Sequence, residues 1–589
     1  MTDLNLIISA DVKRVAKQQF GYEGDIQLQP IGSGFEGTHT VVCFPISKAA
    51  RKSPEQTANE IGQHLNKDLI AGFQVVKGFL NLTIRDKVWI SSLIDIYSQK
   101  DFGTLPPNGK EIMVEYSSPN TNKPLHLGHL RNNFLGWSVS EIFTANGYKV
   151  HKVQIINDRG IHICKSMAAW KLYGNGETPQ SSGLKGDHLV GKYYVAFDKR
   201  YKEEIKELAE AGASQEEAEK SAPIMKLASE MLRLWEAKDP ETVTLWKTMN
   251  GWVYEGFAKT YQRMGVDFEK LYYESDTYLL GRDEVLKGVE SGVFFKKDDG
   301  SVWVDLTKDG LDQKVLLRSD GTSVYMTQDI GTAMLRFRDF PKIERQVYTV
   351  GNEQEYHFKV LFLILGKLGY SWAKECYHLS YGMVDLPTGK MKSREGTVVD
   401  ADDLMQEMVE EAEKQTRELG KIDEIDEAQA NDLFEMIGIG ALKYFLLKVD
   451  PKKRMMFDPA ESIQLQGHTG PFIQYTHARI RALLRKADTM NLDPGNISND
   501  VLEPTEREVI NVITQYPHKL AEAAREYAPS IIANYAYELA KSYNQFYQAV
   551  KIFEGDPSKI AFRLAFSKVV ADVLKKSMWL LGIRVPDKM

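Results

Sequence analysis

SPNTNKPLHLGH, residues 118–129, is the stretch of this chain that decides the fold. It follows an apolar run at 111–116 that predicts a buried strand, and it precedes an amphipathic run at 127–146 that predicts a helix. A helix N-terminus after a strand and a turn directs backbone N–H groups and the positive end of the helix dipole at a bound anion. His126 and His129 share one face of that helix start, and the glycine between them leaves room for a ligand. The segment therefore predicts a triphosphate site without a Walker-type glycine loop.

Length and composition indicate a multidomain globular protein. The chain has 589 residues, 43% hydrophobic and 26% charged, which suits about three or four domains. No apolar run is long enough to span a bilayer, and the N-terminus lacks a targeting pattern, so we expect a cytoplasmic protein without a membrane partner. The three cysteines have no disulfide or metal spacing, and no metal site is predicted. A net charge of −7 excludes a generally basic nucleic-acid binder but allows a local basic face.

The pattern along the chain predicts a multidomain α/β protein. Strand and helix patterns alternate after a breaker cluster at 105–109, which is typical of a Rossmann-like parallel sheet. Strand-like runs return at 302–306, 323–326 and 346–350, and the chain is strongly helical after about residue 400. The predicted units are an N-terminal α+β domain (1–110), a catalytic parallel-sheet domain (111–400) with a solvated helical insertion (about 170–250), a helical connector (401–455) and an all-α helical bundle (456–589).

The histidine string identifies a family. His126-Leu127-Gly128-His129 resembles the His-Ile-Gly-His signature of class I aminoacyl-tRNA synthetases. With the residues ahead of it, the longer string resembles the arginyl-tRNA synthetase family in particular. Those residues are Glu115, Ser118, Pro119, Asn120 and Lys123. An HxGH string also arises by chance as two histidines on a helix surface, so partner motifs must decide between the two interpretations.

A second string, GKMKSREGT at 389–397, resembles the Lys-Met-Ser-Lys-Ser loop of the same class. A cationic loop flanked by glycine can close on a triphosphate and stabilise the charge on departing pyrophosphate. Ser393 stands where the signature has its second lysine, and the resemblance implies that Lys123 supplies the missing cation. Glu395 replaces an expected basic residue, and whether it alters loop closure stays open.

The resemblance assigns roles to these residues one by one. The implied catalytic residues are Lys123, His126, His129 and Lys390, and the implied ATP contacts are Pro119, His126, Gly128, His129, Lys390, Met391 and Ser393.

A third string, YMTQD at 325–329, is expected at the end of a strand and suits an arginine pocket. A guanidinium needs planar carboxylate acceptors, which Asp329 and Glu115 could supply, and Tyr325 could stack on it. The resemblance implies that Ser118 and Asn120 hold the α-amino group, and that Gln354 and His357 lie against the substrates. The alternative is that Asp329 caps the next helix, 330–337, and that Gln354 and His357 cap a helix at 355–368.

The helical C-terminal region carries an RNA-binding signal. FIQYTHARIRALLRKA, 472–487, interleaves basic and aromatic residues as single-stranded RNA loops require. With the chain end, it resembles the anticodon-binding domain of the family. The resemblance also implies that the N-terminal domain, 1–110, is an additional tRNA-contacting domain. The implied tRNA contacts are Phe472, Tyr475, Arg479 and Met589. A plain amphipathic helix with solvated charges is the alternative.

The GxGxxG string in 31–38 is interpreted as a turn, because no long helix follows it and no lysine lies on the next strand.

These motifs, in this order, predict an arginine–tRNA ligase that forms arginyl adenylate from L-arginine and ATP and transfers arginine to tRNA(Arg). The resemblance also implies that tRNA binds before activation. ATP with Mg²⁺ is expected as substrate, with no tightly bound cofactor, and the chain is expected to be a monomer. The alternatives are a class I synthetase for cysteine, glutamine or lysine, a nucleotidyltransferase that makes a small adenylylated metabolite, and an inactive RNA-binding relative. The absence of cysteine clusters counts against the cysteine enzyme, and the basic-aromatic helix counts against the nucleotidyltransferase. The intact nucleotide motifs count against the inactive relative.

Overall fold

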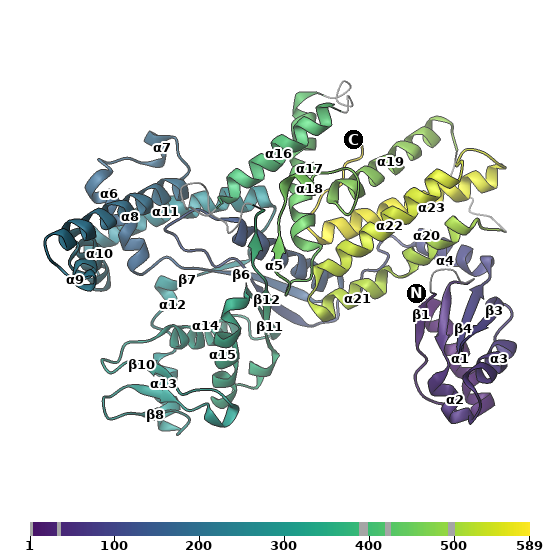
Figure 1. Ribbon diagram of the computed structural model, residues 1–589, viewed down its shortest axis with the longest axis horizontal. Helices are drawn as coiled ribbons and strands as arrows, with labels where there is room; N and C mark the ends of the chain where they lie inside the picture. Colours follow the sequence, from purple (N-terminus) through teal and green to yellow (C-terminus); the bar gives the residue numbers. More distant parts are fainter. Residues whose placement is uncertain (1–3, 32–36, 388–398, 419–425, 493–500) are drawn as a thin grey trace.

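The computed structural model describes residues 4–31, 37–387, 399–418, 426–492 and 501–589. Its centre is a parallel sheet, with a helical insertion on the left of Figure 1, a helical bundle on the right and a small N-terminal domain at lower right. Among the described residues, no helix combines the length and apolar character that a membrane crossing needs.

The N-terminal domain is a four-stranded antiparallel sheet in the order β1-β2-β4-β3, covered by helices. Its elements are α1 (Leu4–Phe20), β1 (Leu28–Pro30), β2 (His39–Val42), α2 (Phe44–Ala50), α3 (Pro54–His64), β3 (Ile70–Val76) and β4 (Phe79–Ile84). Helix α4 (Asp86–Ser98) leads out of it, and Asp86 accepts hydrogen bonds from the Leu502 backbone and from Arg507 of the helical bundle. The predicted α+β domain is confirmed, although most of its GxGxxG string lies outside the described residues.

The central sheet has five parallel strands in the order β12-β11-β5-β6-β7. The strands are β5 (Glu111–Glu115), β6 (Lys149–Ile156), β7 (Lys270–Tyr273), β11 (Ile343–Gly351) and β12 (Cys376–Tyr381). From β5 the chain builds outward through β6 and β7, then returns to the other side of β5 to add β11 and β12. The strand order therefore reverses between β5 and β11, and the carboxyl ends of these strands form the crevice where open parallel sheets bind ligands.

Helix α5 (Leu127–Ala145) begins at the histidine string and is buried along most of its length. It lies so close to β5 that a Cβ on Gly136 would be 2.3 Å from the Cβ of Tyr116. Only glycine permits this approach, which fixes the height of the helix above the strand. The predicted strand, helix and next strand are confirmed almost to the residue.

The helical insertion between β6 and β7 is larger than predicted, since it begins before residue 170 and ends after 250. Its helices are α6 (Ile161–Tyr173), α7 (Pro179–Ser182), α8 (Gly186–Glu210), α9 (Gln215–Ser221), α10 (Pro223–Glu236) and α11 (Pro240–Met264). Buried Asp158, at the end of β6, accepts hydrogen bonds from Tyr254 of α11 and from Ser275 after β7. This carboxylate ties the insertion to the sheet.

A second unit between β7 and β11 packs around an apolar core that it shares with β11 and with the helix that follows it. It consists of α12 (Glu274–Thr277), α13 (Arg282–Glu290), β8 (Phe295–Lys296), β9 (Val302–Val304), a 3-10 turn (Thr307–Asp309), β10 (Lys314–Leu317) and α14 (Tyr325–Asp339). The run at 302–306 contains the strand β9, but this strand belongs to a separate antiparallel sheet, β10-β9-β8. The strand predicted at 323–326 is wrong, because Val324 is the extended N-cap of α14 and Tyr325 begins the helix. A short, mostly apolar run fits a helix start as well as a strand.

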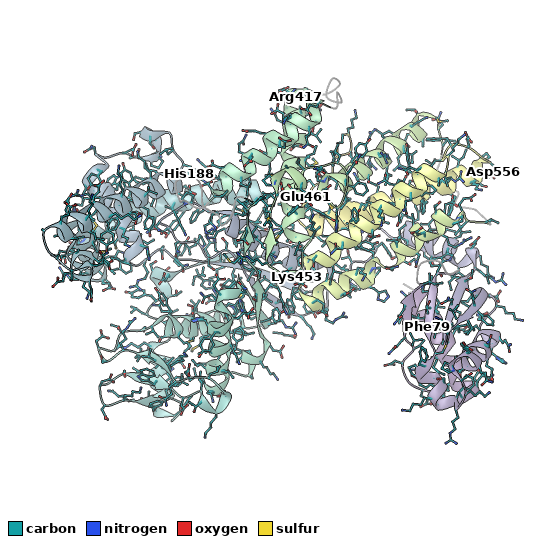
Figure 2. All side chains as sticks on the ribbon, in the orientation of Figure 1. Phe79, His188, Arg417, Lys453, Glu461 and Asp556 are labelled. Atoms are coloured by element: carbon teal, nitrogen blue, oxygen red, sulfur yellow. The ribbon has the colours of Figure 1, made fainter. Side chains whose placement is uncertain are left out.

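After residue 400 the described chain is helical, as predicted. Between β11 and that region lie two 3-10 turns (Asn352–Gln354, Ser371–Glu375), α15 (Glu355–Lys367) and β13 (Val384–Asp385), which pairs with β14 (Met455–Met456). The later helices are α16 (Ala401–Glu418), α17 (Glu427–Leu447), α18 (Pro459–Ser462), α19 (Gly470–Thr489), α20 (Pro504–Thr514), α21 (Tyr516–Glu526), α22 (Pro529–Ala549) and α23 (Pro557–Leu580). Figure 2 places Asp556 at the outer end of this bundle and Lys453 near the central sheet.

Candidate active site and RNA face

The histidine string forms the N-terminal cap of α5. The backbone N–H of Gly128 donates to Nδ1 of His126 at 3.2 Å, and the backbone N–H of His126 donates to Nδ1 of His129 at 3.1 Å. The two rings lie 3.9 Å apart, centroid to centroid. Each Nδ1 is an acceptor, so in a neutral ring the proton is on Nε2. The predicted helix start is confirmed, and its two imidazoles have a defined tautomer.

Burial keeps both imidazoles neutral. It lowers the pKa of His126 to about 4 and the pKa of His129 well below its usual value, and the nearby charge of Lys123 adds to both effects. At neutral pH the string therefore offers two uncharged Nε2–H donors beside the backbone N–H groups of the helix start. Such donors suit phosphate oxygens at a site where the positive charge must come from other residues.

Lys123 lies in the turn before this helix and is half-buried, and burial lowers its pKa. Within the described ranges, no hydrogen bond or ion pair holds its ammonium group. The turn rests on the insertion, because a Cβ on Gly191 of α8 would be 2.8 Å from Cδ of Pro124. A cation that is partly desolvated and without a carboxylate partner is suited to an incoming phosphate.

The lysine string falls in 388–398, so Lys390, Met391, Ser393 and Glu395 lie outside the described residues. The chain on both sides of it is held by α5. Buried Arg131 donates to the carbonyl oxygen of Gly382 at 2.6 Å and to that of Lys453 at 3.0 Å. On the other side, the backbone of Leu127 donates to Val399 at 3.2 Å. Sequence reasoning missed Arg131, which carries no signal beyond its place on an apolar helix.

The carboxylate of Glu115 is already paired within the protein. Glu115 ends β5 and is 4% exposed, and it forms an ion pair with Arg336 of α14, which is 2% exposed. Burial raises the pKa of Glu115, and the guanidinium of Arg336 opposes that rise. Burial alone would lower the pKa of Arg336, but Glu115, together with Tyr348, Tyr272 and Asp329, outweighs burial, and the net effect is to raise it. Arg336 was not among the residues singled out in the sequence, because nothing local marks an arginine as buried.

Asp329 is the fifth residue of α14, so it is neither at a strand end nor a helix cap. One of its carboxylate oxygens lies 2.6 Å from Nε2 of His357 on α15. Asp329 is close enough to β5 that its charge raises the pKa of Glu115. The pocket therefore contains two carboxylates, of which one is buried with an arginine partner and the other is partly exposed.

The other predicted substrate contacts lie around this pocket. Tyr325 is the first residue of α14 and is 76% exposed. Asn120 is exposed and forms a parallel bridge with Asn157 after β6, whose N–H also donates to the carbonyl oxygen of buried Pro119. Ser118 is half-buried, at the end of β5. Gln354 precedes α15 and makes no side-chain cap, so the capping interpretation of that residue is wrong.

Two further features of the crevice were not predictable from the sequence. Ser117 has a left-handed backbone, φ 61°, held by a 2.6 Å hydrogen bond from its N–H to the side chain of Asn132, which in turn donates to the Thr349 carbonyl. A non-glycine residue in this conformation is strained and is typical of functional turns. Burial also raises the pKa of Glu274 to about 7, although Arg159 lies 4.0 Å away.

The basic-aromatic helix, α19, lines a groove of about 890 Å³ in the helical bundle. Tyr475, Arg479 and Met589 all line it, and the guanidinium of Arg479 lies 4.8 Å from the ring centre of Tyr475 and 5.1 Å from that of Tyr547. Phe472 does not line it and packs against Tyr537 instead. The structure thus brings three of the four predicted tRNA contacts to one groove.

Comparisons with known proteins agree with this architecture. Three family models match: "tRNA synthetases class I (R), catalytic domain" over residues 92–458, "DALR anticodon binding domain" over 473–589, and "Arginyl tRNA synthetase N terminal domain" over 3–84. The arginine–tRNA ligase of Amoebophilus asiaticus is 57% identical over 571 residues, covering 96% of each chain. That of Flavobacterium psychrophilum is 54% identical and covers 100% of each. The solved Thermus thermophilus arginyl-tRNA synthetase is 23% identical, covers 100% of both chains and has a TM-score of 0.79, which shows the same fold.

Proposed function

This chain belongs to the arginyl-tRNA synthetase family. We propose that the crevice at the carboxyl ends of β5 and β11 is the site that activates L-arginine and transfers it to tRNA(Arg). The chain is an arginine–tRNA ligase. The residue assignments rest on two neighbouring features. One is the pair of neutral histidines at the start of α5, whose Nδ1 atoms accept backbone hydrogen bonds, and the other is the pocket with two carboxylates.

In the first step, the arginine carboxylate attacks the α-phosphate of ATP, a bond to pyrophosphate breaks, and arginyl adenylate forms. Nε2–H groups of His126 and His129 donate to phosphate oxygens, and Lys123 and Lys390 supply positive charge as pyrophosphate leaves. Pro119, Gly128, Met391 and Ser393 border the nucleotide in this proposal, and Mg²⁺ enters as part of the ATP substrate. No covalent enzyme intermediate is required, so the protein acts by positioning and by stabilising charge.

Arginine is selected by charge and shape. Glu115 and Arg336 neutralise each other, so Asp329 is the carboxylate that faces the substrate guanidinium most directly, with His357 orienting it. Tyr325 stacks on the guanidinium, and Ser118, Asn120 and Gln354 surround the amino-acid end. This refines the role of Glu115 from a direct acceptor to one member of a buried pair that shapes the pocket.

In the second step, a terminal ribose hydroxyl of tRNA attacks the adenylate carbonyl, and AMP leaves. The groove beside α19 binds the anticodon region, where Arg479 meets phosphate and Tyr475 stacks on a base. We further propose that the enzyme works as a monomer in the cytoplasm, in keeping with cysteines that have no disulfide spacing.

ATP–pyrophosphate exchange with each of the twenty amino acids, with and without tRNA, tests the assignment. Exchange should depend on arginine and on tRNA. Equal exchange with lysine or glutamine would contradict the arginine pocket. Full exchange without tRNA would keep the enzyme class and remove the tRNA requirement.

A further inference from the structure

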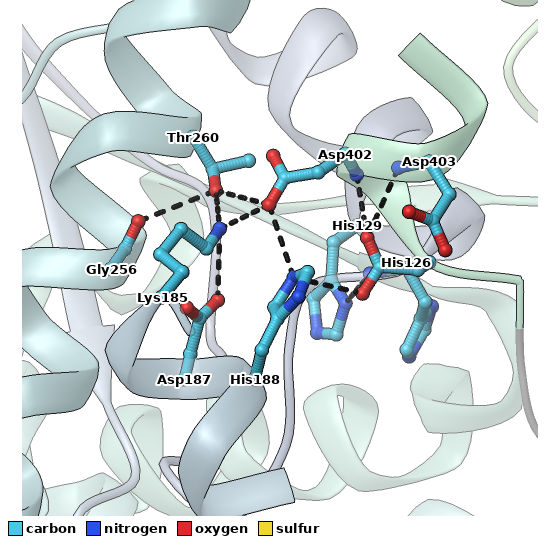
Figure 3. Close-up of polar contacts among 10 residues, drawn as sticks. His126, His129, Lys185, Asp187, His188, Gly256, Thr260, Asp402 and Asp403 are labelled. Atoms are coloured by element: carbon cyan, nitrogen blue, oxygen red, sulfur yellow. Dashed lines mark hydrogen bonds and ion pairs between the residues drawn. The ribbon is translucent and has the colours of Figure 1, made fainter. Parts of the chain in front are cut away.

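A polar cluster joins the insertion to the segment that follows the lysine string (Figure 3). We call it the α8–α16 cluster. It consists of Lys185, Asp187 and His188 at the start of α8, Thr260 of α11, and Asp400 and Asp402 at the start of α16. Figure 3 shows His126 and His129 beside it, and Figure 2 shows His188 on the edge of the insertion that faces α16.

The cluster combines three carboxylates with one lysine and one histidine. Nε2 of His188 lies 3.3 Å from a carboxylate oxygen of Asp400 and 3.3 Å from one of Asp402. Lys185 forms an ion pair with Asp402, and its Nζ lies 3.1 Å from Asp187, which is fully buried. Because Lys185 carries one positive charge against three carboxyl groups, the cluster favours the protonated form of His188.

The same arrangement argues against a metal ion at this place. Oxygen atoms of Asp187 and Asp402 and a ring nitrogen of His188 converge within 4.8 Å, as metal ligands do. However, the ammonium group of Lys185 already lies between the two carboxylates and also donates to Thr260 at 2.5 Å. The cation of this cluster is therefore part of the protein.

The cluster reaches the histidine string through Asp400. One oxygen of Asp400 accepts from the backbone N–H of Asp402 at 2.7 Å and so caps α16, while the other faces His188. The backbone of Asp400 forms an antiparallel bridge with His126, closed by hydrogen bonds from Leu127 to Val399 at 3.2 Å and from Ala401 to Leu125 at 2.9 Å. A residue that holds Asp400 therefore holds the strand-like segment against which His126 rests.

Helix α8 also supports the opposite side of the nucleotide site. Three residues after His188, Gly191 lies against the Lys123-Pro124 turn. The start of α8 thus contacts the turn that carries Lys123. Through the α8–α16 cluster it also contacts the segment around Asp400, which pairs with His126. A shift of α8 would move both sides of the phosphate site together.

We propose that His188 is a positioning residue for adenylate formation: as an imidazolium bound by Asp400 and Asp402, it fixes segment 399–401 against His126 and so orients the histidine pair toward the triphosphate. This inference rests on the function proposed above. His188 touches no substrate in this account and acts through Asp400.

The proposal implies a pH dependence. The hydrogen bond to Asp402 raises the pKa of His188, burial opposes this, the charges of Asp400 and Asp187 add to the rise, and Lys185 reduces it. The neighbouring His126 is neutral and adds no charge. Because the folded-state pKa lies above the unfolded value of about 6.5, the ion pairs are fully formed below that value and are lost as pH rises through the folded pKa. The positioning effect should therefore weaken on the alkaline side.

The test measures arginine- and tRNA-dependent pyrophosphate exchange over about pH 6 to 9. His188→Asn places a polar side chain there that cannot become charged, and we expect kcat to fall about tenfold with an unchanged KM for arginine. Its profile should lack the alkaline decline of the unaltered enzyme. His188→Lys keeps a permanent cation, so it should retain most of the rate and also abolish the decline. His64→Asn, on the exposed face of α3, is the matched control and should change neither quantity.

A second variant separates positioning from a folding defect. Asp400→Asn preserves the cap on α16, because an asparagine oxygen accepts the same backbone hydrogen bonds, but it removes the charge that faces His188. Combined with His188→Asn, it should add little to the loss, since both changes remove one interaction. Additive losses, or an unchanged kcat and pH profile in His188→Asn, would overturn the inference. Failure of the unaltered enzyme to exchange with arginine would overturn the proposed function instead.

Discussion

Replacing Arg336 with methionine should damage stability and arginine binding together. The guanidinium is 2% exposed and its partner Glu115 is 4% exposed, so water cannot take over for the lost partner. Removing one member of a buried ion pair costs about 3–5 kcal/mol, because the remaining charge is left uncompensated. Methionine keeps an unbranched apolar stem but lacks the guanidinium atoms, so the space that they leave adds to the electrostatic loss.

The loss of arginine binding follows from the charge on Glu115. Burial already raises its pKa, and without Arg336 that pKa should rise further, so the carboxyl becomes neutral and the ion pair that shapes the arginine pocket is lost. We expect the KM for arginine to rise at least about tenfold and the KM for ATP to change little. Raising the pH of the variant should restore part of the arginine affinity as Glu115 ionises. It should also lower stability, since a raised carboxyl pKa favours the folded state only while the group is protonated.

Urea denaturation and exchange kinetics measure the two effects. Adding Glu115→Gln to Arg336→Met should recover stability, because the folded protein no longer has to protonate a buried carboxylate, but should not recover arginine binding. Arg233→Met is the control, since Arg233 pairs with Glu230 on the exposed surface of α10 and its loss should leave the urea midpoint unchanged. If Arg336→Met has the midpoint and arginine KM of the unaltered enzyme, the buried pair does not shape the pocket.

Three further changes test the other assignments. Asp329→Asn should raise the KM for arginine by an amount equivalent to about 2–5 kcal/mol, and a larger effect on ATP would move this residue to the nucleotide site. Lys123→Ala should slow adenylate formation about 10²–10³-fold in single-turnover assays and leave transfer from preformed adenylate unaffected; normal activation would make it a solvated turn residue. Arg479→Ala should weaken tRNA binding and reduce the salt slope by about one, and an unchanged tRNA affinity would leave α19 a structural helix only.

The parts of the fold that the sequence predicted are those whose signal is local. The strand at 111–115, helix α5 and the strand at 149–156 follow from apolar periodicity and from breakers at both ends, and they were placed almost to the residue. Gly470-Pro471 likewise marked the start of α19. Such elements carry enough consecutive residues for the period to be counted.

The failures involve short segments and long-range pairing. The strand-like run at 323–326 is too short to distinguish a strand from the extended N-cap and first turn of α14. Glu115 was recognised as a candidate substrate ligand, but its partner, Arg336, lies 221 positions further along the chain and on another element. Likewise, the link between His188 and Asp400 crosses from the insertion to the start of α16. No periodicity or spacing reports on contacts of this kind.

The neutrality of the histidine pair explains why the cations of this site are placed elsewhere. Both imidazoles are desolvated at the N-terminus of a helix, where the dipole and the buried surroundings each penalise positive charge, so a protonated pair would destabilise the fold before any substrate bound. Fixed neutral donors avoid that cost and need no rearrangement when phosphate arrives. The charge that stabilises departing pyrophosphate is better carried by long side chains outside the helix, and Lys123 meets this condition because its turn adjoins the helix and the residue is only half-buried. The division also predicts that pH changes near neutrality act on the supporting cluster at His188 and leave the phosphate donors unchanged.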